Sequence, residues 1–181
     1  LTRLLEEGVN LEAKDEDGWL VGTALMAAAR RGNLDCLEHL VAKGANLEAT
    51  SHDGDTALME AAYFGGLDCL DHLIAKGANM NAQNNMKRTA LHWAAESGVV
   101  PCVELLLKAG ADASLKDEDG TTALGIAKKW FRMKVIKLLE NAPAIAAQAE
   151  EERRAAKLAV LPEHLRLGVT LPGMRELLSQ L

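Results

Sequence analysis

A repetition with a step of 33 residues is the feature that most constrains how this chain can fold. The triplet Thr-Ala-Leu begins at Thr23, Thr56, Thr89 and Thr122. The same step relates the three cysteines and two sets of glycines: Cys36, Cys69 and Cys102; Gly32, Gly65 and Gly98; Gly44, Gly77 and Gly110. A fixed period of this length is typical of a repeat array, in which one unit cannot bury its own apolar face. Such units stack, and contacts between neighbours supply much of the stability.

The second complete unit predicts two short helices and a projecting loop. Thr56 can cap a first helix, and Gly65 ends it. A second helix is expected from about Leu67 to Lys76, with Gly77 as a left-handed stop. Residues 78–85 are polar and turn-rich, which predicts a hairpin-like finger and not a third helix. Small alanines at paired positions let the helices of adjacent units approach closely: Ala28 and Ala29, Ala61 and Ala62, Ala94 and Ala95.

These features resemble the ankyrin repeat, whose pattern is Thr-Pro-Leu-His, paired alanines, a glycine, a leucine-rich second helix and Gly-Ala-Asp/Asn. The resemblance covers residues 1–140, where Gly44-Ala45-Asn46 matches the closing motif directly. Alanine replaces the proline in all four triplets, and only His92 keeps the family's histidine. The resemblance implies an all-α ankyrin-repeat solenoid of one half-repeat plus four repeats. A C-terminal helical extension, 141–181, follows it and carries no resemblance.

Three irregularities interrupt the regular array. Residues 1–8 read as the end of a second helix without its partner, so we expect a missing upstream chain or a capping subunit. The finger around Trp19 is longer than the others, because Gly8 to Thr23 spans 15 residues where the later units span 12. The last repeat has Phe131 where the glycine should be, and we interpret it as a terminal capping unit.

Charge and composition narrow the classes of partner. The net charge is −6, and no Lys/Arg cluster is present, which argues against a nucleic acid or an anionic membrane. No apolar run has the length needed to insert into a bilayer. The three cysteines are expected to be free thiols in a reducing intracellular compartment, the cytoplasm or an organelle.

Catalytic and metal motifs give no positive signal. The sequence has no Gly-rich phosphate loop, no GxSxG and no HExxH, so we expect neither an enzyme nor a bound cofactor. Cys-x-x-His occurs at Cys36/His39 and at Cys69/His72, one helical turn apart, as a zinc site would require. Equivalent positions of stacked helices lie roughly 8–10 Å apart, however, too far for four ligands to share one ion. We therefore expect no metal, with cysteine acting as a small core residue.

The aromatic residues are the better indication of function. Ankyrin arrays serve as protein-binding scaffolds, and the resemblance implies that the two residues before the first-helix glycine face the concave groove. Exposed aromatics and arginines dominate binding hot spots. We expect a non-catalytic interaction scaffold in a larger assembly; the alternative is a regulatory domain attached to an enzyme that lies outside these residues. The expected contact residues on the concave face and fingers are Trp19, Arg30, Arg31, Glu60, Tyr63, Phe64, Met86, Arg88, Trp93 and Trp130.

The extension changes character after Pro143. Residues 144–161 are rich in Ala, Glu and Arg and predict a helix with charge pairs one turn apart. Residues 163–181 are apolar, which predicts a docking arm or a cap and not a free tail. Either a partner protein receives this segment, or the last repeat receives it around Trp130 and Phe131. The apolar residues expected to make the contact are Leu171, Met174, Leu177 and Leu178.

Overall fold

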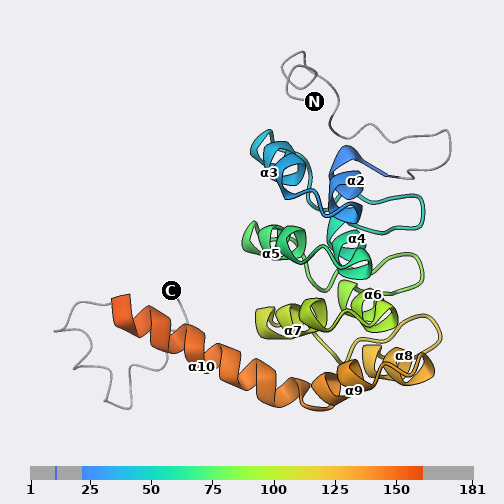
Figure 1. Ribbon diagram of the computed structural model, residues 1–181, viewed down its shortest axis with the longest axis vertical. Coiled ribbons are helices and arrows are strands. Elements are labelled where there is room, and N and C mark those ends of the chain that lie inside the picture. The colour runs from blue at the N-terminus through green and yellow to red at the C-terminus, as the bar shows by residue number, and fades with distance from the viewer. Residues whose placement is uncertain (1–10, 12–21, 161–181) are drawn as a thin grey trace.

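The computed structural model describes Leu11 and residues 22–160, which form an elongated stack of paired helices (Figure 1). Four pairs follow one another along the chain: α2 (Ala24–Arg30) and α3 (Leu34–Ala42), α4 (Ala57–Phe64) and α5 (Leu67–Ala75), α6 (Ala90–Ser97) and α7 (Val100–Ala109), α8 (Ala123–Lys129) and α9 (Met133–Glu140). The described residues contain no β-strand beyond one isolated bridge between Lys116 and Thr122. The predicted all-α solenoid is confirmed. The half-repeat at residues 1–8 and the finger around Trp19 lie outside the described residues.

The helix ends lie where the repeated Thr and Gly predict them. The Thr56 hydroxyl accepts a hydrogen bond from the Met59 backbone N–H at 3.4 Å, which caps α4. Gly65 ends the same helix with φ 79°, a left-handed conformation that L side chains rarely adopt. Because α4 is only eight residues long, these caps contribute to its stability as much as the helix propensity of its residues does.

The core is a continuous double row of small and aliphatic side chains. First helices pack on first helices through the paired alanines, all of which are buried. Second helices pack behind them through leucines at the repeated position, among them Leu40, Leu73 and Leu106. Each such leucine contributes about 1.5–3 kcal/mol by leaving water. The small alanine side chains allow the close approach that the sequence predicts.

Each finger closes with the same turn. The residue that begins the turn is buried and polar in all three described fingers: Ser51, Asn84 and Asp117. The side chain at this position accepts a backbone N–H four residues ahead, for example from Arg88 to the Asn84 Oδ1 at 2.9 Å. Neighbouring fingers are also joined, because the Glu118 N–H donates to the Met86 carbonyl at 2.9 Å. The fingers therefore form a hydrogen-bonded ladder beside the first helices.

A long helix, α10 (Ala142–Val160), follows the last repeat and runs away from the stack (Figure 1). It begins two residues earlier than the sequence predicts, with Pro143 in the first turn, where no backbone N–H is needed. Its first half packs on α7 and α9 through Ala142, Ile145 and Ala149. The Arg153 guanidinium donates to the backbone carbonyl of Lys108 on α7. This half of α10 therefore covers the C-terminal part of the second-helix row.

The exposed aromatics of the last repeat do not hold α10. Trp130 is 50% exposed and Phe131 is 83% exposed, whereas α10 packs on α7 and α9. The remaining part of the extension, with Leu171, Met174, Leu177 and Leu178, lies outside the described residues. Which surface receives that apolar segment therefore stays a prediction.

Candidate functional site

A hollow of about 250 Å³ lies beside α2, α4, α6 and the finger that precedes α4. Charged, aromatic and thioether side chains line it: Arg30, Asp55, Met59, Glu60, Tyr63, Phe64 and Trp93. Three successive repeats contribute to this lining. The hollow therefore depends on the stacking and exists in no single repeat.

Three aromatic rings form one wall of the hollow. Tyr63 meets Phe64 edge to face with ring centroids 5.0 Å apart, and it meets Trp93 in the same way at 5.4 Å. Such edge-to-face pairs contribute about 0.5–1.5 kcal/mol beyond the area that they bury. Tyr63 is nevertheless 38% exposed and Phe64 is 52% exposed. The rings are held by one another while part of each stays open to solvent.

An arginine–glutamate pair forms the opposite wall. Arg30 donates from Nε to Glu60 Oε2 at 2.9 Å and from its terminal nitrogen to Oε1 at 3.0 Å. The hydrogen bonds to Glu60 raise the pKa of Arg30, and its guanidinium lies 5.1 Å from the centre of the Phe64 ring. The Glu60 side chain is only 9% exposed. Glu60 is therefore largely enclosed and holds Arg30 in place, and its role as a partner contact stays a prediction.

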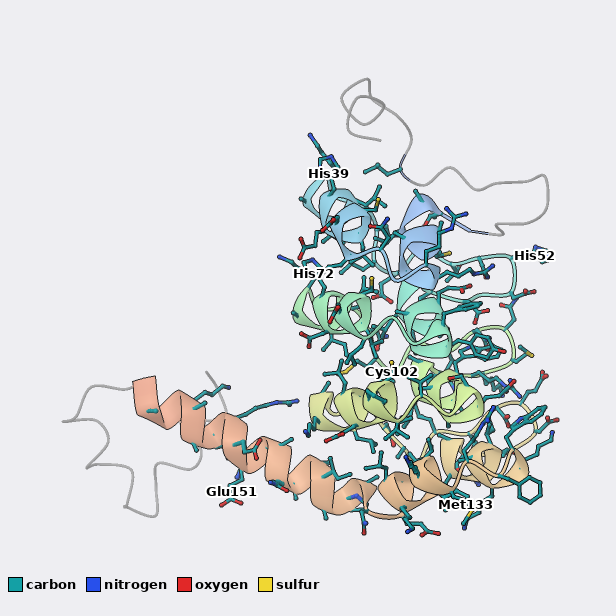
Figure 2. All side chains as sticks on the ribbon, in the orientation of Figure 1. His39, His52, His72, Cys102, Met133 and Glu151 are labelled. Atoms are coloured by element: carbon teal, nitrogen blue, oxygen red, sulfur yellow. The ribbon has the colours of Figure 1, made fainter. Side chains whose placement is uncertain are left out.

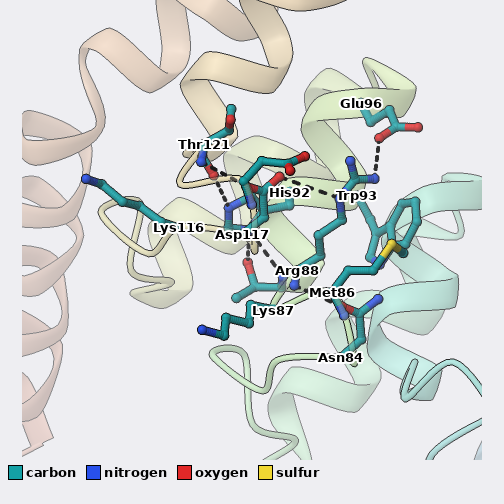
Figure 3. Close-up of polar contacts among 12 residues, drawn as sticks. Asn84, Met86, Lys87, Arg88, His92, Trp93, Glu96, Lys116, Asp117 and Thr121 are labelled. Atoms are coloured by element: carbon teal, nitrogen blue, oxygen red, sulfur yellow. Dashed lines mark hydrogen bonds and ion pairs between the residues drawn. The ribbon is translucent and has the colours of Figure 1, made fainter.

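A second arginine fixes the far side of Trp93. The Arg88 guanidinium lies 5.0 Å from the centre of the Trp93 ring and donates to Glu96 at 2.7 Å. Its Nε also lies 3.8 Å from Asp117 of the next finger (Figure 3). The two acids hold the guanidinium over the indole, so the orientation of Trp93 is set from both sides.

Asp55 is the residue of the hollow that sequence reasoning missed. Its Oδ1 accepts hydrogen bonds from the Trp93 indole N–H at 3.0 Å and from the Asn84 amide at 2.8 Å. Burial raises the pKa of Asp55 above its ordinary value of 3.8, and these hydrogen bonds oppose the rise. Asp55 precedes a helix-capping threonine, as Arg88 does in the next repeat. A comparison of that position between repeats is the signal that could have found it.

The structure gathers some of the predicted contact residues and separates others. Arg30, Glu60, Tyr63, Phe64 and Trp93 line the hollow, and Arg88 lies against it. The remaining described residues lie apart from the hollow's lining: Arg31, Met86 and Trp130. The predicted contacts Trp19, Leu171, Met174, Leu177 and Leu178 lie outside the described residues.

The Cys-x-x-His motifs lie on the second helices, on the other side of the stack (Figure 2). Within the part of the chain that the structure describes, no group of three or more His, Cys, Asp or Glu side chains could hold a metal ion. Cys69 and Cys102 are buried, and burial raises the pKa of Cys102 to about 11. No helix among the described residues is long and apolar enough to cross a membrane.

A stack of helix pairs with projecting fingers defines a helical repeat array. The family model of ankyrin repeats (three copies) matches residues 1–84 and residues 58–149. The chain belongs to the ankyrin repeat family. Comparison with curated proteins gives no match. Ankyrin repeats are in general protein–protein interaction modules and are typically non-catalytic.

Proposed function

We propose that this chain is a protein-binding scaffold whose main contact surface is the aromatic cluster of Tyr63, Phe64 and Trp93. The observation that carries this proposal is that three touching rings stay partly exposed beside two arginines. Aromatic and arginine side chains are the types that carry most of the binding energy in protein interfaces.

The charged network around the cluster supports the same function. Arg30 is fixed by Glu60, and Arg88 is fixed by Glu96, so the side chains that a partner would touch are already ordered. Ordering a long side chain at an interface costs about 0.5–1.5 kcal/mol. Here the free protein has already lost much of that freedom, which favours binding with little rearrangement.

The proposed role is binding without catalysis, in a subunit or part of a larger assembly. The free cysteines support a reducing intracellular compartment as its place of action. We divide the chain into an array, residues 1–140, and an extension, residues 141–181. The packing of α10 on α7 and α9 supports a capping role for its first half. The apolar residues after Pro162 are proposed as a second docking element.

The double change Tyr63→Ala/Phe64→Ala tests the contact surface. Proteins retained by the immobilised chain are identified by mass spectrometry, and the affinity of each purified candidate is then measured by calorimetry. Loss of both rings should weaken binding by more than about 2 kcal/mol, because hot-spot aromatics carry such energies. The thermal midpoint of each variant is measured in parallel, to separate lost contacts from lost structure.

A matched control lies on α5, where Asp68 and Asp71 are exposed. Asp68→Ala/Asp71→Ala should retain the partner with unchanged affinity, because α5 belongs to the second-helix row. Equal affinity of the aromatic variant and the wild type, at equal stability, would move the interface away from the cluster. The extension would then be the next surface to test.

A further inference from the structure

The hollow carries an unbalanced negative charge. Its lining contains one cation, Arg30, and two acids, Asp55 and Glu60, which gives a net charge of −1. Arg30 is committed to Glu60 through two hydrogen bonds. Among the described residues, no lysine or arginine comes within ion-pair distance of Asp55. The unbalanced charge therefore belongs to Asp55.

The hydrogen bonds of Asp55 leave one carboxylate oxygen for a ligand. Both donors from the described residues, the Trp93 indole N–H and the Asn84 amide, bind Oδ1. Neither donor is charged, so the acid is partly removed from water with no cation in direct contact, and Arg30 acts on it only from beyond ion-pair distance. Burial raises its pKa, which shows that ionising this group costs more here than in water. A cation placed against it would relieve that cost.

The shape of the hollow suits a long side chain with a charged end. Tyr63, Phe64 and Trp93 offer an apolar wall, and the buried Met59 offers an apolar floor. Lys and Arg bury their methylene stems along such surfaces while the charged group stays at a polar site. A volume of about 250 Å³ lies below the roughly 300–1,000 Å³ of small-molecule pockets, so it suits one side chain.

We infer that the hollow receives a lysine or arginine side chain of the partner protein, with its stem on the aromatic wall and its cation on Asp55. This inference rests on the proposed protein-binding function and names the chemistry of the partner at its contact point. An acidic side chain would meet the unbalanced charge of Asp55 and would be repelled. An uncharged aliphatic side chain would leave Asp55 without its countercharge.

Nuclear magnetic resonance of the full chain tests this inference directly, because the Trp93 indole N–H reports on Asp55. The probe is Nα-acetyl-lysine N-methylamide, and the comparison compound is the norleucine analogue, which has the same stem without the charge. The lysine probe should produce a saturable shift of the Trp93 indole signal. The norleucine analogue should bind at least about tenfold more weakly.

Asp55→Asn removes the charge while its amide oxygen can still accept both hydrogen bonds, so the fold is retained. In this variant the lysine and norleucine probes should bind equally. Asp53→Asn is the matched control, since it removes the same charge from an exposed position of the same finger and should preserve the preference for lysine. Equal binding of both probes to the wild type would overturn the inference, as would the absence of a saturable shift.

The inference and the proposed function fail separately. If Tyr63→Ala/Phe64→Ala abolishes partner binding and Asp55→Asn leaves the affinity unchanged, the aromatic contact surface is supported. The cation site is then contradicted. If the lysine probe binds preferentially but Tyr63→Ala/Phe64→Ala does not weaken binding of the protein partner, the cation site is supported. Its proposed use in partner binding is then contradicted.

Discussion

His92 joins two repeats through both of its ring nitrogens. The Thr89 backbone N–H donates to Nδ1 at 3.1 Å, so Nδ1 is an acceptor and the proton of the neutral ring lies on Nε2. Nε2 lies 3.3 Å from the Thr121 carbonyl of the next finger, which accepts that proton in a hydrogen bond. Burial of the ring lowers the pKa of His92 below its ordinary value of 6.5. The fold therefore favours the neutral form.

This arrangement predicts a loss of stability in mild acid. Between pH 6.5 and the lower pKa of folded His92, the unfolded chain binds more protons at His92 than the folded chain, so the free energy of unfolding falls as the pH falls through this range. His92→Met should reduce this dependence and lower stability at neutral pH by about 1–2 kcal/mol, because a helix cap is lost. Urea denaturation across the acid range measures both effects.

Methionine is the matched replacement for His92, since Met26 and Met59 occupy the equivalent buried positions of earlier repeats.

Asp55 affects the pH dependence of stability in the opposite sense to His92. Its raised pKa means that the folded chain binds more protons than the unfolded chain just above pH 3.8. A pH dependence that is unchanged by His92→Met would show that another group causes the acid sensitivity.

Two non-glycine residues have a left-handed backbone conformation at positions that glycine occupies in the other repeats. Lys87 has φ 56° where the neighbouring fingers have Gly54 and Gly120. Phe131 has φ 54° where the earlier first helices are followed by Gly32, Gly65 or Gly98. A left-handed conformation costs an L residue roughly 1–2 kcal/mol. Both elements therefore contain backbone strain that a glycine would remove.

Lys87→Gly should raise the free energy of unfolding by up to about 1 kcal/mol, since relief of strain exceeds the added chain entropy. Its backbone N–H, which donates to the Asn84 carbonyl at 2.8 Å, is retained. Lys76→Gly is the control of opposite sign, because Lys76 has φ −85° and gains nothing from glycine. A lower stability of the Lys87 variant than of the control would contradict this account.

The elements were more predictable from the sequence than the site. The period of 33 predicts α4 and α5 to within a residue, because capping threonines and terminal glycines act locally. The burial of Glu60 was not predictable, since it depends on Arg30 reaching across from the preceding repeat. Asp55 likewise acquires its role from Trp93, which is 38 residues away. Contacts between repeats depend on side-chain geometry, which a repeat pattern does not specify.

At the scale of the whole molecule, each repeat is stabilised mainly by its contacts with the neighbouring repeats. In such arrays the end units have a single neighbour and open most readily. The first half of α10 gives the C-terminal end additional cover, because Ala142 and Ala149 are buried and Ile145 packs against the core. The position of α10 on two second helices ties the last repeat to the one before it.

Truncation after Glu140 should therefore lower the stability of the isolated array by about 2 kcal/mol, the value expected for exposing these apolar contacts. Truncation after Val160 is the control, since it keeps the whole of α10. Thermal melting of both proteins measures the difference. Equal midpoints for the two truncated chains would show that α10 does not act as a cap.

The cysteines allow the opening of individual repeats to be measured by thiol alkylation. Cys36 is half-buried, whereas Cys69 and Cys102 are fully enclosed in the next two second helices. A thiol-alkylating reagent reaches an enclosed sulfur only while the helix around it is transiently open. The relative alkylation rates of Cys69 and Cys102 therefore report how often each of two successive repeats opens, whereas the half-buried Cys36 can react without such opening. Slower labelling of Cys102 than of Cys69 would mean that the solenoid opens more readily towards its N-terminal side.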